Sequence, residues 1–222
     1  MNKLKKNDPI SFHIITIFPK ILDSYFSESL FKRALKNNLL KINFYNLRDF
    51  TNDVHRTVDD KPYGGGGGMV LKPEPILKCL ISIKKKIKRS SKSLVISFDL
   101  RGKSYNQKMA HDFGNYDDII FICGRYEGID ERVKKFMADI TLTIGPYILA
   151  GGELPAAILV ESIMRLKSGF LGKYESLEEI KGSYPVYTRP ENLTINNKAC
   201  RVTKVLIEGN HKEINKWRGI IE

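Results

Sequence analysis

Cysteine and histidine are scarce in this chain of 222 residues, and their scarcity limits the metal and disulfide chemistry open to it. Cys79, Cys123 and Cys200 are scattered without the spacing of metal ligands, and an odd number argues against a disulfide framework. The four histidines do not cluster either. We therefore expect a protein of a reducing cytoplasm, without a structural zinc or another metal site.

Long apolar runs are also missing. Nothing in the chain approaches the roughly 20 consecutive apolar residues that a membrane-spanning helix needs. Residues 1–8 are basic, but the apolar run after them is short and is interrupted by His13 and Pro19. We therefore expect neither a signal peptide nor a membrane partner.

The common nucleotide-binding signatures are incomplete. No glycine-containing loop ends in the Gly-Lys-Ser/Thr of a Walker A motif, and none has the Gly-x-Gly-x-x-Gly spacing of a dinucleotide-binding turn. These absences argue against a nucleoside triphosphate or a dinucleotide as the ligand.

Positive charge, by contrast, is abundant. Lysine and arginine number 37 against 25 acidic residues, which gives a net charge of +12. An anionic partner such as nucleic acid is the natural inference, because basic side chains that neutralise phosphates release counterions. A general bias toward Lys, Ile and Asn explains the charge equally well, and the basic run at 84–89 is typical of a solvated helix end.

Five adjacent glycines, Gly64 to Gly68, follow a segment rich in charged and aromatic side chains at 55–63. Such a run costs much conformational entropy and buries no apolar surface. Flexible linkers usually contain serine, whereas this run directly follows His, Arg, Asp, Lys and Tyr. Glycine runs are kept where the backbone approaches something closely or adopts positive φ, and the charged neighbours here favour a loop that binds a polar ligand.

Apolar segments alternate in the order expected of βα units. The periodicity predicts strands at 12–17, 40–45, 93–98, 118–123 and 140–144, and helices at 21–35, 75–86, 130–137 and 154–166. This alternation predicts an α/β domain with a mostly parallel sheet. Residues 168–190 have the composition of a linker. A last helix is predicted at 210–221, with Asn210 as its N-cap and Glu213 completing a capping box.

Three loops follow predicted strands, at 99–103, 123–132 and 144–155. Open α/β sheets bind their ligands at the carboxyl ends of the strands. We therefore expect the ligand site among these loops.

Five segments together, and in order, resemble the bacterial tRNA (guanine-N1)-methyltransferases, which belong to the knotted (SPOUT) class of S-adenosylmethionine-dependent RNA methyltransferases. They are residues 55–69, 123–132, 144–155, 187–191 and 209–218. The resemblance covers nearly the whole chain. It implies transfer of a methyl group from S-adenosyl-L-methionine to N1 of guanine 37, just 3′ of the tRNA anticodon.

The same resemblance implies an architecture. An α/β domain with a C-terminal trefoil knot would occupy residues 1–166, followed by an interdomain linker at 167–188 and a small helical tRNA-binding domain at 189–222. That last domain would be shortened, because the family commonly continues as a helical tail beyond Trp217 and Arg218. The resemblance also implies a cytoplasmic homodimer that binds tRNA and not DNA.

The family's cofactor loops match one glycine and one continuous segment of this chain. The residues implicated in binding the cofactor are Gly124, Ile144, Gly145, Pro146, Tyr147, Ile148 and Leu149. Glycine backbone would contact the polar edges of the cofactor while the larger side chains supply an apolar wall. Pro146 stands where the family usually has Asp, and residues 99–102 replace a Ser-Pro-x-Gly type turn, so cofactor affinity is expected to differ.

Methylation of N1 requires removal of its proton and stabilisation of the charge that builds toward O6. Arg165 matches the arginine that the family uses for the second task. The family's base is an Asp in the interdomain linker, but this linker contains no Asp. Glu178 and Glu179 are the candidate substitutes.

The resemblance assigns the glycine run, in particular Gly65 and Gly66, to the side where guanine enters. Arg189 and His211 are expected to contact the tRNA.

Two alternatives remain open: a related knotted methyltransferase with another RNA target, and a non-catalytic or weakly active RNA-binding remnant of the family. The shortened linker without Asp motivates the second alternative.

Overall fold

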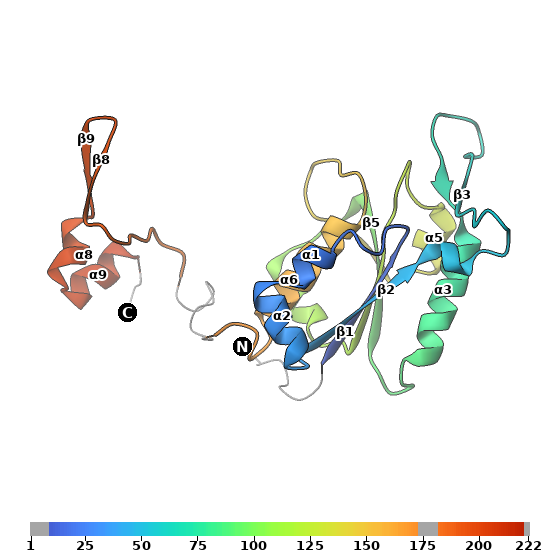
Figure 1. The fold of residues 1–222 in the computed structure, drawn as a ribbon, viewed down its shortest axis with the longest axis horizontal. Coiled ribbons are helices and arrows are strands. Elements are labelled where there is room, and N and C mark those ends of the chain that lie inside the picture. Colours follow the sequence, from blue (N-terminus) through green and yellow to red (C-terminus); the bar gives the residue numbers. More distant parts are fainter. Residues whose placement is uncertain (1–8, 173–181, 220–222) are drawn as a thin grey trace. The chain divides into compact units, whose positions relative to one another are not determined.

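A computed structural model describes residues 9–172 and 182–219 (Figure 1). The chain forms two compact units, Met1–Gly172 and Lys173–Glu222. This division falls beyond the expected domain end at residue 166, because Phe170 is buried in the core of the first unit, where its backbone carbonyl accepts a 2.7 Å hydrogen bond from Arg33.

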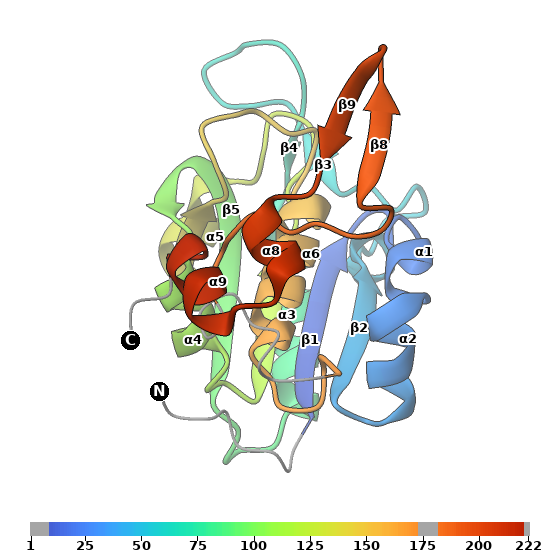
Figure 2. The same ribbon diagram turned by 90° about the vertical axis from the view of Figure 1, so that its left-hand side faces the viewer.

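A five-stranded sheet forms the centre of the first unit, and all its strand pairs are parallel. Its strands stand in the order β2-β1-β6-β5-β7, and Figure 2 shows β1 beside β2. Their bounds are β1 Ile10–Thr16, β2 Leu40–Asn46, β5 Ser93–Ser104, β6 Asp118–Ile122 and β7 Ile140–Thr143. Every residue of β6 is buried, as expected for a central strand covered on both faces. The predicted α/β class and parallel sheet are confirmed.

Helices cover both faces of the sheet (Figure 1). One core layer packs against α1 Asp23–Phe26, α2 Ser29–Lys36, α4 Gln107–Phe113 and α6 Glu153–Arg165. The other packs against the 3-10 helix η1 Leu47–Phe50 and the helices α3 Pro73–Lys86 and α5 Glu131–Phe136. This two-sided cover buries the apolar strand residues that the sequence pattern identified.

The single helix predicted at 21–35 is wrong, since the segment forms α1 and α2. Glu28 adopts an extended conformation, with φ −121° and ψ 165°, and the Ser27 hydroxyl donates to the Ser24 carbonyl. The break lets Phe26 and Phe31 pack edge to face, with ring centroids 5.0 Å apart. Tertiary packing of these aromatic side chains overrides a continuous helical pattern.

The glycine run lies between two short strands, β3 Asp59–Asp60 and β4 Val70–Leu71, which pair antiparallel. The predicted positive φ is present at Gly64, Gly65, Gly66 and Gly68. The run is therefore the tip of a closed hairpin-like loop.

The second unit contains a hairpin that the sequence analysis did not predict (Figure 2). Its strands, β8 Asn192–Ile195 and β9 Lys198–Arg201, pair antiparallel. The helices α8 Lys204–Glu208 and α9 His211–Trp217 follow. The predicted cap of the last helix is confirmed, because the Asn210 side chain accepts from the backbone of Lys212 and Glu213.

Candidate functional site

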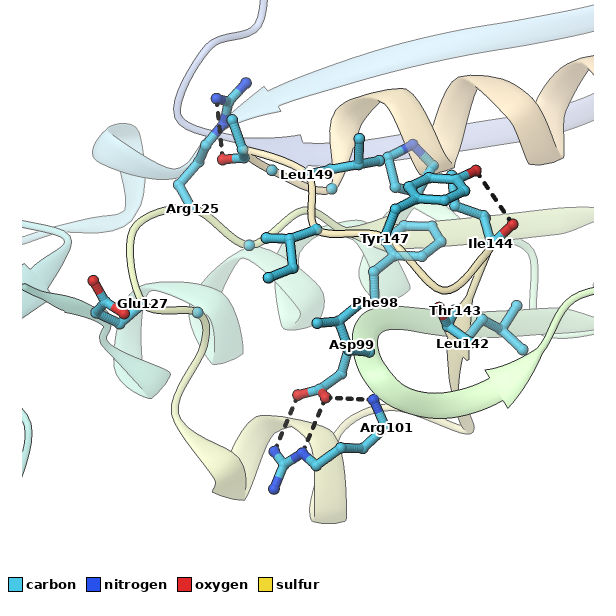
Figure 3. A pocket seen from close by; sticks show the side chains of 18 of the residues that line it. Phe98, Asp99, Arg101, Arg125, Glu127, Leu142, Thr143, Ile144, Tyr147 and Leu149 are labelled. Atoms are coloured by element: carbon cyan, nitrogen blue, oxygen red, sulfur yellow. Dashed lines mark hydrogen bonds and ion pairs between the residues drawn. The ribbon is translucent and has the colours of Figure 1, made fainter.

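A pocket of about 400 Å³ lies at the carboxyl ends of β6 and β7 and beside a bulge within β5 (Figure 3). The three predicted loops each supply one wall. The lining residues are Phe98 to Arg101, Gly124 to Gly128, Leu142 to Ile144, Tyr147 to Gly152, and Pro155. All three loops that the sequence analysis singled out therefore contribute to the same pocket.

The first wall is a bulge in β5. Phe98 and Lys103 both pair with Leu142 of β7, so residues 99–102 leave the ladder and project to the pocket. A Cβ on Gly102 would lie 2.6 Å from the carbonyl carbon of Leu142. Only glycine permits this close approach of two backbones.

The second wall follows β6. Tyr126 and Gly128 have positive φ, at 59° and 118°. The Gly124 carbonyl accepts a 3.0 Å hydrogen bond from Gly152 N in the third wall. A Cβ on Gly152 would lie 2.7 Å from Cys123 Cα, so the second and third walls are in direct backbone contact.

The third wall contains most of the predicted cofactor residues. Ile144, Tyr147, Ile148 and Leu149 line the pocket together with Gly124, whereas Gly145 and Pro146 belong to the loop without lining it. The loop is held by its own polar groups: Thr143 Oγ1 donates to the Gly145 carbonyl at 3.0 Å. Ile148 is 83% exposed, so an apolar surface faces outward at the pocket rim.

A buried ion pair joins two of these walls to the end of β1. Glu153 is 1% exposed and accepts a 2.6 Å hydrogen bond from the Thr16 hydroxyl. Its Oε2 lies 3.0 Å from Arg125, whose guanidinium also donates to the Ala150 carbonyl and packs over the Phe18 ring. Sequence reasoning missed both residues. The signal that could have identified Glu153 is a carboxylate directly after two glycines, Gly151 and Gly152, at the start of a helix.

A second ionic cluster holds the first wall against α5. Asp99 accepts from Arg101 at 3.1 Å (Figure 3) and from Lys134 Nζ at 2.6 Å, and Lys134 also contacts Glu131 at 2.6 Å. Hydrogen bonds from Arg101, and then from Lys134, hold the pKa of Asp99 well below its usual range. Lys134 likewise lowers the pKa of Glu131. No sequence signal pointed to Lys134.

Gly65 and Gly66 are exposed and lie outside the set of pocket-lining residues. The end of their loop is nevertheless bonded to the second wall. Glu127 N donates to the Met69 carbonyl, and Leu71 N donates to the Gly128 carbonyl, each at 3.0 Å. The glycine run and the pocket are therefore linked through backbone.

Arg165, the predicted catalytic arginine, is half-buried in the last turn of α6. The first turn of α6 carries Glu153, and a rise of 1.5 Å per residue places the two ends roughly 18 Å apart. The chain therefore does not bring its own Arg165 into the pocket that its loops form.

Arg189 and His211 are exposed in the second unit. Glu178 and Glu179 lie outside the described residues.

Within residues 9–172 and 182–219, no helix has the length and apolarity needed to cross a membrane. The same residues contain no group of three or more His, Cys, Asp or Glu side chains able to hold a metal ion.

Comparison with known proteins gives a consistent family. A profile described as tRNA (Guanine-1)-methyltransferase TrmD matches residues 10–220. A tRNA (guanine-N(1)-)-methyltransferase of Clostridioides difficile is 45% identical over 212 residues, covering 93% of this chain and 90% of the relative. Its counterpart in Dictyoglomus turgidum is 45% identical over 210 residues, covering 92% and 82%. The crystal structure of tRNA (m1G37) methyltransferase from Aquifex aeolicus matches with a TM-score of 0.78 and 35% identity, covering 95% of this chain and 88% of that one.

Proposed function

The chain belongs to the tRNA (guanine-1)-methyltransferase family, and from this premise we propose that it methylates N1 of guanine 37, just 3′ of the tRNA anticodon, using S-adenosyl-L-methionine. The observation that carries the proposal is that the family match runs through all three loops that build the pocket. Since tRNA is the proposed substrate, we also propose a cytoplasmic location.

The pocket fits the cofactor in size and chemistry. Its volume of about 400 Å³ is within the usual range for small-molecule sites. Leu100, Tyr147, Ile148 and Leu149 offer apolar surface to a purine, and the glycine-rich backbone of the second and third walls leaves room for its polar edges. When bound, the cofactor supplies a methyl group on a positively charged sulfonium.

Arg165 stabilises the charge that develops toward O6 as the guanine loses its N1 proton. Because Arg165 lies at the far end of α6 from the pocket, we assign this role to the Arg165 of a second protomer, which makes the functional enzyme a homodimer. Apolar side chains exposed on one face support such an assembly: Leu154 is 58% exposed and Ile158 43%. Tyr25, hydrogen-bonded to Glu161 of α6, extends this face onto α1.

The proton on N1 is accepted by Glu178 or Glu179. These are acids of the segment that precedes the second unit's described residues, the interdomain linker in which the family has its Asp base. A glutamate reaches one methylene further than an aspartate, which suits a shorter segment.

Substrate contacts come from two parts of the chain. Gly65 and Gly66 present exposed backbone with positive φ, at 80° and 116°, where the guanine enters. Arg189 and His211 contact the tRNA backbone from the second unit, which includes the helices α8 and α9. Backbone and shape dominate this recognition, except at the target base, which is turned out of its stack.

We also propose that the segment from β5 to α6 forms the family's trefoil knot. The hydrogen bond between Gly152 N and Gly124 O supports this assignment, because it joins loops that leave different strands.

The test is transfer of a tritiated methyl group to tRNA transcripts that differ only at position 37. Transcripts with guanine should accept the label and yield 1-methylguanosine on nucleoside analysis, whereas transcripts with adenine should not. Labelling that is indifferent to this base would overturn the assigned target. Absence of labelling with either transcript would favour a non-catalytic RNA-binding protein.

A further inference from the structure

The first wall of the pocket depends on side chains for its position. Residues 99–102 make no ladder pairs with β7, because the register passes from Phe98 directly to Lys103. Both flanks of the bulge are fixed on Leu142, and Gly102 approaches its backbone closely. The part that reaches the pocket, Asp99 to Arg101, needs another anchor.

Lys134 provides that anchor. The Asp99 carboxylate accepts from the backbone and the side chain of Arg101, but those bonds stay within the bulge. Lys134 reaches Asp99 at 2.6 Å from a different element, α5. The Lys134 side chain is 11% exposed and that of Asp99 19%, so solvent screens their attraction less than it screens a surface pair.

The helix that carries Lys134 is the continuation of the second wall. Asp130, which follows the Gly124–Gly128 wall after one residue, caps α5 by accepting from Arg132 N at 2.9 Å. A bond from α5 to Asp99 therefore ties the first wall to the second. The distance between the two walls determines whether a flat apolar ligand contacts both of them.

We propose that Lys134 is a positioning residue for the cofactor, which fixes the Asp99–Gly102 bulge and so sets the affinity of the pocket for the S-adenosyl group. The inference rests on the proposed function and extends it. Replacing Lys134 by methionine keeps the length of the side chain but leaves Asp99 and Glu131 with Arg101, whose side chain is 76% exposed. The link of the bulge to α5 is then reduced to the exposed 3.5 Å contact between Arg101 and Glu131.

The experiment is calorimetric titration of the full-length protein with S-adenosyl-L-homocysteine. Lys134→Met should weaken binding by roughly fivefold to twentyfold, as expected for the loss of a coupled contact. Lys134→Arg should recover most of the affinity, since a guanidinium also bridges two carboxylates. Lys135→Met, an exposed neighbour in the same helix, is the matched control and should bind like the wild type. In turnover assays, Lys134→Met should raise KM for the methyl donor and leave kcat within about twofold.

Two outcomes would overturn the inference. One is a wild-type affinity in Lys134→Met, with or without a lowered melting temperature, and the other is an equal loss of affinity in Lys135→Met. A wild-type protein that does not bind S-adenosyl-L-homocysteine would overturn the proposed function and this inference with it. Equal binding by the wild type and Lys134→Met overturns the inference alone.

Discussion

Substituting Arg125 by alanine should strongly destabilise the first unit, because it leaves the Glu153 carboxylate buried without its cation. Glu153 is 1% exposed and the Arg125 side chain 17%, with 3.0 Å between their charged atoms. At an effective dielectric constant of about 20, two unit charges at this distance attract by about 5.5 kcal/mol. The variant loses that attraction but retains the desolvation cost of Glu153, and the Thr16 hydroxyl still satisfies one oxygen. We expect a loss of about 3–5 kcal/mol, against a typical total of about 5–15 kcal/mol.

Urea unfolding followed by far-UV circular dichroism measures this loss. Trp217 is the only tryptophan of the chain and lies in the second unit, so its fluorescence reports separately on a part that the substitution does not touch. Arg132→Ala is the matched control. Arg132 pairs with Asp130 at 2.8 Å, but its side chain is 61% exposed, so the loss should stay below about 1 kcal/mol.

The double variant Arg125→Ala with Glu153→Gln tests the cause. If an unpaired buried charge accounts for the loss, neutralising Glu153 should recover part of it, and the two effects will not add. Strict additivity, or an Arg125→Ala variant as stable as Arg132→Ala, would refute the reasoning.

Four further predictions concern other parts of the molecule. Gly152→Ala should lower the free energy of unfolding by about 1–3 kcal/mol, because its Cβ would lie 2.7 Å from Cys123 Cα, while Gly67→Ala, with open space around its Cβ, should be nearly neutral in the same urea titration. Mixing an Arg165→Ala protein with a Gly152→Val protein should restore up to about a quarter of wild-type methyl transfer, because random pairing gives heterodimers with one intact site; no restoration would place Arg165 in its own protomer's site. Burial raises the pKa of Cys79 to about 12 and that of Cys123 well above its usual range, so at about pH 8 Ellman's reagent should titrate exposed Cys200 alone in the folded protein, and all three thiols in denaturant. The lowered pKa of Asp99 contributes stability above the ordinary carboxyl pKa of about 4, so the deficit of Asp99→Asn in unfolding free energy should be constant from about pH 5 to pH 8 and shrink below about pH 4.

The sequence predicted those parts of the fold that have a strong local signal. The run at 119–123 is wholly apolar, and with Asp118 before it this segment forms the buried strand β6, Asp118–Ile122. Helix α4 was missed because only Met109, Ala110 and Phe113 of its short span are buried, too few to give a clear period. The hairpin of β8 and β9 is exposed along its whole length, and the polar–apolar alternation of β8 covers only the four residues Asn192–Ile195, which makes it a weak signal. Its other local signal is Asn196-Asn197, both with positive φ, as a tight hairpin turn requires.

The candidate site, like the fold, was predicted only where the sequence has a local signal. Its three loops could be located because each follows a recognisable strand and contains glycine. The side-chain contacts that hold these loops could not be predicted, because the paired residues are far apart in the sequence. Arg125 and Glu153 are separated by 28 residues, and Asp99 and Lys134 by 35. Such pairs are set by how the elements pack, and an isolated Lys or Glu in the sequence gives no sign of its partner.

The order of the pocket along the chain has a consequence for biosynthesis. Every residue that lines the pocket lies between Phe98 and Pro155, within the first compact unit. A ribosome makes the chain from its N-terminus, and domains generally fold as units during synthesis. A nascent chain that has reached Gly172 therefore already holds the complete set of pocket-lining residues, before any residue of the second unit has been added.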